Sequence, residues 1–173
     1  GDKALADYTE KVISELRAWI QSTGDDWPRQ KHKLAKAAAN WLINELFKHL
    51  KTHGLDVSKL KISPENFAEF ICLVYQEKVN SSAAQTILEQ MFKQGGDPTQ
   101  IMADLGLEQL DDRAALEKII AEIVFKNQKQ VDEYKSGKTN VLQFLVGQVM
   151  AATQGKANPK LLLEILTDIL KNN

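Results

Sequence analysis

The sequence has a single cysteine, four prolines and no long apolar run. Cys72 cannot form a disulfide within one chain, which fits a reducing compartment. No apolar segment approaches the roughly 20 residues of a membrane helix. The polar N-terminus lacks the apolar core of a signal peptide, and it begins with Gly1 instead of Met. We therefore expect a cytoplasmic chain with no membrane contact, which either is a trimmed fragment or carries added residues at its N-terminus.

Groups suited to catalysis or metal binding are scarce. Nucleophilic catalysis needs a Cys or Ser within reach of a base, but Cys72 lies in an apolar helical pattern and all three histidines fall between residues 32 and 53. His49 and His53 are four residues apart and could occupy two positions on a metal, although no third ligand is evident. Their alternative role is to interact with the dipole at a helix end. We expect no catalytic site, metal or cofactor in these residues.

Proline and glycine mark helix boundaries throughout the chain. Three prolines follow a capping residue, in Ser63-Pro64, Asp97-Pro98 and Asn158-Pro159, and a further helix is expected to open at Pro28 after a break at residues 24–26. Five glycines follow periodic apolar stretches and predict helix ends: Gly54, Gly95, Gly106, Gly137 and Gly155.

Apolar residues between these marks recur with helical spacing, and no alternating run predicts a strand. The sequence therefore predicts an all-α, multihelical fold of about nine helices. The loop from His53 to Ser63 is the best internal boundary. It divides the chain into a long-helix subdomain, residues 1–60, and a compact bundle of shorter helices, residues 61–173.

Charge is segregated along the chain despite a net charge of −1. Residues 26–61 hold eight Lys and Arg against three Asp and Glu, residues 65–125 hold four against eleven, and residues 126–160 hold six against two. Two basic blocks are compatible with a polyanion partner. Charge alone favours the simpler alternative, in which the solvated faces of amphipathic helices differ.

The segment from Val141 to Gln154 contains no charged side chain. Its core stripe is expected to carry Leu142, Leu145, Val146, Val149, Met150 and Thr153. The opposite face is also uncharged, with Val141, Phe144, Gln148, Ala151 and Ala152, so the pattern predicts burial all round. Gly147 has two interpretations, the close approach of a neighbouring helix or a small-residue face left open for a partner.

A lysine-bearing turn follows this segment. Gly155 and Asn158 shape the turn, and Lys156 and Lys160 lie beside the start of the next helix. Exposed N–H groups at a helix start, together with lysines, predict a phosphate site. Lys135 and Lys138 precede the segment in a similar way. The alternative is that all these lysines are merely solvated turn residues.

A family resemblance favours the phosphate interpretation. "DEYKSGKTNVLQFLVGQVMAATQGKANPKLL", Asp132 to Leu162, resembles the C-terminal motif of the YqeY family and of the tail domain of the B subunit of the bacterial aspartyl/glutamyl-tRNA amidotransferase. The match runs through Tyr134, Gly137-Lys138, the block 145–150 and Gly155 to Pro159. "KAAANWLINEL", "ISPENFAEFICLV" and "MFKQGGDPTQIMADLGLEQL" also resemble the B subunit, and the Asn-Trp element favours it over free-standing YqeY. "QSTGDDWPRQKHKL" departs from the family pattern.

The resemblance implies a helical linker plus a tail domain that binds tRNA without catalysing. The full subunit would use ATP and Mg²⁺ to convert Asp-tRNA(Asn) and Glu-tRNA(Gln), together with the A and C subunits, through a catalytic domain absent from these residues. The tRNA-contact candidates are Lys138, Gly155, Lys156, Asn158, Lys160, Gln148, Gly147, Lys135 and Lys36, with Lys33 and Asn40 weaker. The alternative is a helical protein-interaction module that docks other subunits through Phe144, Gln148 and Ala151.

Overall fold

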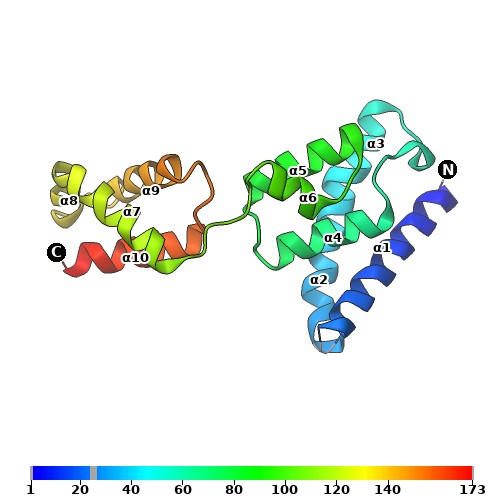
Figure 1. Ribbon diagram of the computed structural model, residues 1–173, viewed down its shortest axis with the longest axis horizontal. Coiled ribbons are helices and arrows are strands. Elements are labelled where there is room, and N and C mark those ends of the chain that lie inside the picture. Colours follow the sequence, from blue (N-terminus) through cyan, green and yellow to red (C-terminus); the bar gives the residue numbers. More distant parts are fainter. Residues whose placement is uncertain (1, 24–26, 173) are drawn as a thin grey trace. The chain divides into compact units, whose positions relative to one another are not determined.

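A computed structural model describes residues 2–23 and 27–172 (Figure 1). The helices are α1 Asp2–Ser22, α2 Trp27–Trp41, the π-helical η1 Leu42–Phe47, α3 Lys48–His53, the 3-10 turn η2 Val57–Lys59, α4 Pro64–Tyr75, α5 Ser81–Gln94, α6 Pro98–Asp104, α7 Arg113–Lys126, α8 Gln128–Lys135, α9 Val141–Ala152 and α10 Pro159–Asn172.

The predicted all-α fold is confirmed. Because α2, η1 and α3 follow one another without a break, the described residues contain nine continuous helical segments besides η2. Their only extended pairing is an isolated parallel bridge between Leu110 and Ala157. None of the described helices is long and apolar enough to cross a membrane. The predicted break at residues 24–26 lies outside the described residues.

The chain forms two compact units, residues 1–106 and residues 107–173, called unit 1 and unit 2 below. This division does not coincide with the predicted boundary between residues 60 and 61. In unit 1, α1 packs along α4, and the Tyr8 hydroxyl on α1 donates a hydrogen bond to the Ile62 carbonyl over 3.0 Å. Residues on both sides of the predicted boundary therefore share one core.

The core of unit 1 is centred on α4. Phe67, Phe70 and Ile71 are fully buried, and the rings of Trp41 and Phe70 meet edge to face with centroids 5.0 Å apart, a favoured geometry for aromatic pairs. Cys72 on the same helix is buried. Burial, and then the charge of Glu69, raise the pKa of its thiol to about 12. The thiol is therefore protonated near neutral pH, as expected of an inert core cysteine.

The predicted helix caps of α4 and α6 are present. Ser63 Oγ accepts a hydrogen bond from the Asn66 N–H over 3.1 Å, with Pro64 in the first turn of α4. Asp97 Oδ1 accepts one from the Gln100 N–H over 2.9 Å at the start of α6. These side chains satisfy backbone donors that have no partner within the helix.

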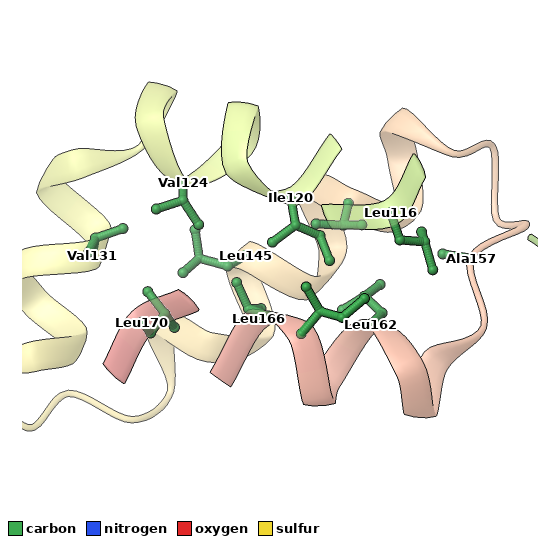
Figure 2. Packing of buried hydrophobic residues seen from close by; sticks show 11 residues of the cluster. Leu116, Ile120, Val124, Val131, Leu145, Ala157, Leu162, Leu166 and Leu170 are labelled. Atoms are coloured by element: carbon green, nitrogen blue, oxygen red, sulfur yellow. The ribbon is translucent and has the colours of Figure 1, made fainter. Parts of the chain in front are cut away.

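Unit 2 has a separate aliphatic core made by α7, α8, α9 and α10 (Figure 2). The helices α7, α9 and α10 each contribute a stripe, α8 contributes one residue and the α9–α10 turn another. The buried residues are Leu116, Ile120, Val124, Val131, Leu145, Val149, Ala157, Leu162, Ile165, Leu166 and Leu170. The i, i+4 spacing within α7 and α10 places these side chains on one face of each helix. The core fixes α9 against α7 and α10 and so positions the turns at both ends of α9.

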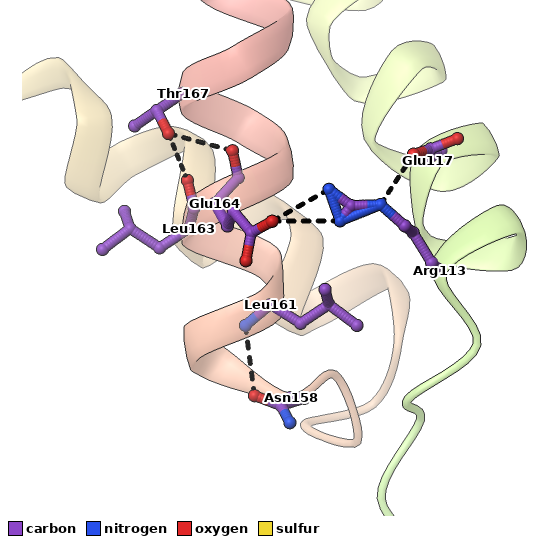
Figure 3. A network of polar contacts seen from close by, with 7 residues as sticks. All are labelled: Arg113, Glu117, Asn158, Leu161, Leu163, Glu164 and Thr167. Carbon is purple, nitrogen blue, oxygen red and sulfur yellow. Dashed lines mark hydrogen bonds and ion pairs between the residues drawn. The ribbon is translucent and has the colours of Figure 1, made fainter.

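Surface contacts join α7 to α10 in unit 2 (Figure 3). Arg113 Nη1 and Nη2 both donate to Glu164 Oε1, over 3.1 and 3.0 Å. Arg113 Nε also lies 3.2 Å from Glu117 Oε1. All three side chains are about half exposed. Each such surface pair contributes at most about 1 kcal/mol to folding, so the aliphatic core remains the main source of stability.

Candidate nucleic-acid interface

One face of α9 is exposed. Leu145 and Val149 are fully buried, whereas Gly147, Gln148 and Ala151 are exposed and Phe144 is 44% exposed. The prediction that this helix is buried all round is therefore wrong. The side chains of the outer face are uncharged. A lack of charge does not by itself require burial, because a face in contact with solvent can also carry Gly, Ala and Gln.

Gly147 lies in open space. Among the described residues, no heavy atom lies within 4 Å of the position that a Cβ on Gly147 would occupy, apart from its own helix backbone and chain neighbours. The close approach of a neighbouring helix therefore does not explain this glycine in unit 2. The second interpretation, a small-residue face open to a partner, is the one that remains.

The turn between α9 and α10 is a tight, locally bonded structure. Gln154 and Gly155 both have left-handed backbones, with φ of 54° and 76°. The Gly155 N–H donates to the Met150 carbonyl over 2.7 Å, and Thr153 Oγ1 accepts from the Ala157 N–H over 3.3 Å. Gly155 therefore has a structural reason to be glycine, because an L side chain is strained at this φ.

The same turn is bonded to the segment before α7. The Leu110 N–H donates to the Lys156 carbonyl over 2.7 Å, and the Asn158 N–H donates to the Leu110 carbonyl over 3.1 Å. Ala157, between the two, is fully buried at the end of the unit 2 core (Figure 2). These bonds fix the backbone that carries Lys156 and Lys160.

Asn158 caps α10 and closes its N-terminus. Its Oδ1 accepts hydrogen bonds from the N–H groups of Lys160 and Leu161, over 3.0 and 3.2 Å; the bond from Leu161 is drawn in Figure 3. The Asn158 carbonyl accepts from the Leu162 N–H over 2.9 Å, and Pro159 has no N–H. These N–H groups are therefore already satisfied, and the prediction that exposed N–H groups here bind phosphate gains no support. Phosphate contact would have to come from the lysine side chains.

The four candidate lysines of unit 2 lie at the two ends of α9. Lys135 and Lys138 are exposed before its first residue, and Lys156, half-buried, and exposed Lys160 follow its last. Twelve helical residues span about 18 Å, so the lysines do not form one cluster. The uncharged face of α9, defined by Phe144, Gly147, Gln148 and Ala151, lies between them along the helix.

Lys36 belongs to unit 1, on the exposed side of α2. Asn40, one turn further on, is exposed and accepts a hydrogen bond from Asn44 Nδ2 over 2.6 Å. The Lys33 ammonium lies 5.7 Å from the centroid of the Tyr75 ring, a cation–π distance. Lys33, Lys36 and Asn40 therefore all lie on α2 of unit 1 and are not part of unit 2.

No metal site is formed by the described residues, which contain no group of three or more His, Cys, Asp or Glu side chains suited to one. His49 instead stacks on the Phe92 ring, with His53 beside it. The weaker of the two interpretations of this histidine pair, metal binding, gains no support.

A comparison with known families settles the relationship of the chain. The model of the GatB domain matches residues 29–170. The chain belongs to the GatB domain family. The match covers most of the chain, including α9 and its two lysine-bearing turns. It thereby confirms the resemblance drawn from the motif around them.

Relatives of this GatB-domain chain are named as the B subunit of aspartyl/glutamyl-tRNA(Asn/Gln) amidotransferase. The protein from Zymomonas mobilis subsp. mobilis is 39% identical over 96% of this chain and 34% of its own length. The protein from Persephonella marina is 39% identical over 79% of the chain and 29% of its own length. The protein from Shouchella clausii is 38% identical over 96% of the chain and 32% of its own length. The chain spans about a third of the length of the relatives it matches.

Two features of the GatB-domain site were not predicted from the sequence. The sequence places Asp111 only at an acidic helix start, and no local pattern links it to the Asn158 side chain, 47 residues away. The sequence patterns place Phe144 and Gln148 on the same uncharged face, and both are exposed in the structure, but only Gln148 was also named as a tRNA-contact candidate. The position of Phe144 four residues before Gln148 was the available signal.

Proposed function

We propose that this chain is the non-catalytic tRNA-binding portion of the B subunit of a glutamine-dependent amidotransferase. The names of its relatives, which are B subunits of an aspartyl/glutamyl-tRNA(Asn/Gln) amidotransferase, support both the class of enzyme and tRNA as the partner. The observation that carries the proposal is the pair of lysine-bearing turns at the two ends of α9, with an exposed uncharged face between them. On this proposal, ATP and Mg²⁺ act in parts of the protein outside this chain, and the A and C subunits are further partners.

The chemistry of the site suits RNA backbone. Lysine ammonium groups at Lys138, Lys156 and Lys160 would contact phosphates, which position an RNA without reading its sequence. The open surface at Gly147 would let ribose or phosphate approach the helix closely. Phe144, 44% exposed, offers a ring on which an unstacked base could lie. Structured RNA would thus be recognised by shape more than by sequence.

The test is titration of the full chain with uncharged tRNA at two salt concentrations. Log affinity falls linearly with log salt concentration, and removing one phosphate contact should make this slope less steep by about 0.7 to 0.9. Lys138→Ala and Lys156→Ala should each weaken binding, and their effects should add because the two lysines lie beyond opposite ends of α9, a helix about 18 Å long. Lys78→Ala, at an exposed lysine of unit 1, is the charge-matched control and should change neither affinity nor slope.

Two results would contradict the proposal. One is no binding at low salt, and the other is unchanged affinity and slope in both lysine variants. The exposed, uncharged face of α9 supports one competing function, docking of another protein of the complex. Apolar docking would respond little to salt, and Phe144→Ala would weaken it while the lysine variants would not.

A further inference from the structure

The Asp111 carboxylate contacts the turn that carries Lys156 and Lys160. Asp111 Oδ1 accepts a hydrogen bond from Asn158 Nδ2 over 2.9 Å and another from Gln109 Nε2 over 3.2 Å. Gln109 is buried, whereas Asp111 is exposed. A negative charge therefore lies directly against a turn whose lysines are proposed to bind phosphate.

Asp111 and the first N–H groups of α10 favour the same orientation of the Asn158 amide. With Nδ2 directed to Asp111, Oδ1 is directed to the N–H groups of Lys160 and Leu161. If the amide were reversed, an NH₂ group would face two N–H donors, which is unfavourable. The backbone hydrogen bonds of Leu110 to Lys156 and Asn158 fix the same turn. Leu110 therefore bonds the backbone of the turn, and its neighbour Asp111 bonds the Asn158 side chain.

We propose that Asp111 is a positioning residue for RNA binding, which orients the lysines of the α9–α10 turn through Asn158. This inference rests on the proposed function. On this proposal, removing the Asp111 side chain changes RNA affinity in the opposite direction to that expected from charge alone. By charge alone, removing an acidic group beside a phosphate-binding turn should strengthen binding, because like charges repel. If Asp111 positions the turn, removing its acceptor oxygen should weaken binding.

The decisive comparison uses two substitutions that remove the same charge. Asp111→Asn keeps an Oδ1 that can accept from Asn158 Nδ2, whereas Asp111→Ala removes the acceptor. We expect Asp111→Ala to bind tRNA about five-fold more weakly, the effect of one hydrogen bond. Asp111→Asn should bind as well as the unmodified chain or slightly better. Glu108→Gln, at a nearby exposed acid, controls for the loss of one negative charge.

Two further readouts separate positioning from a general loss of folding. The salt slope should fall in Asp111→Ala because a displaced lysine no longer neutralises a phosphate; a smaller folded fraction would weaken binding without changing the slope. The NMR signals of the Asn158 side-chain amide should move in Asp111→Ala and stay in place in Asp111→Asn. The thermal midpoint of each variant checks that the chain is folded.

The possible failures are distinguishable. If Lys156→Ala and Lys160→Ala leave tRNA binding unchanged, the proposed function of this turn is wrong, whatever Asp111 does. If those lysine variants weaken binding but both Asp111 variants strengthen it, only the positioning role is overturned. Equal weakening by Asp111→Ala and Asp111→Asn would also overturn it, because the charge and not the acceptor oxygen would then matter.

Discussion

The imidazole of His49 is stacked on the ring of Phe92, with centroids 3.7 Å apart and planes 4° from parallel. This contact joins α3 to α5 within unit 1. The centroid of the His53 ring lies 4.3 Å from that of His49, and Glu45, Lys48 and Glu89 line the same pocket. Burial, and then the charge of His53, lower the pKa of His49 below its ordinary value of 6.5.

The lowered pKa predicts that stability falls on mild acidification. Because the folded chain disfavours protonated His49, the unfolded chain binds the proton first as pH falls below 6.5. The contribution of His49 is complete above that pH and is lost as pH falls through the folded pKa. His49→Phe keeps a ring against Phe92 and removes the titration. Urea unfolding above and below pH 6.5 should show the variant losing less stability than the unmodified chain; parallel losses would contradict the assignment to His49.

Two glycines of unit 1 should respond differently to the same substitution. Gly54 and Gly95 both have positive φ, 59° and 72°. A Cβ at Gly54 would meet nothing within 4 Å, but one at Gly95 would lie 2.7 Å from the Lys61 carbonyl oxygen. We expect Gly54→Ala to cost about 1 kcal/mol of unfolding free energy from backbone strain, and Gly95→Ala at least about 2 kcal/mol more from the added clash. Equal costs in urea unfolding would show that the backbone near Lys61 relaxes freely.

The two cores should respond separately to a cavity in unit 2. Leu145 is fully buried, so Leu145→Ala should cost about 3 kcal/mol. Hydrogen exchange should accelerate at amides of α7, α9 and α10, while α1 and α4 of unit 1 keep their protection, because each unit has its own core. Leu163→Ala, at a leucine that is 42% exposed, is the control and should change exchange little. Equal acceleration in unit 1 would mean that the units unfold together.

Local chemistry was enough to predict the helices. Ser63, Asp97 and Asn158 each cap the helix that the sequence assigned to them, and Gly137 and Gly155 have the positive φ expected after a helix end. Such signals depend on a few neighbouring residues and on backbone sterics alone. Predictions made from them therefore do not depend on how the helices pack together.

Packing between distant segments could not be predicted in the same way. The loop at residues 53–63 carried boundary signals, yet Tyr8 bonds to Ile62 within this loop, across the predicted boundary between residues 60 and 61. The N-terminus of α10 was expected to have exposed N–H groups, but the Asn158 side chain that caps it accepts hydrogen bonds from two of them. The partner of Asn158, Asp111, is 47 residues away. Periodicity and capping rules describe single elements and do not determine such pairings.

Gly147 gives a prediction in which stability and binding move in opposite directions. It lies inside α9, and among the described residues outside its own helix backbone no atom lies within 4 Å of the position of an added Cβ. A helix-interior glycine costs about 1 kcal/mol relative to alanine. Gly147→Ala should therefore raise the unfolding free energy of unit 2 by up to about 1 kcal/mol, measured by urea unfolding. If RNA approaches the helix at this position, the added methyl group should also weaken tRNA binding.

Ala152→Gly is the matched reverse change at an exposed alanine near the end of the same helix. It should lower stability, and because it adds no atoms it should not obstruct an approaching RNA. A Gly147→Ala variant that is more stable and binds tRNA with undiminished affinity would show that the RNA does not contact α9 at Gly147. The lysines at the two ends of the helix would then have to bind without close contact at its middle.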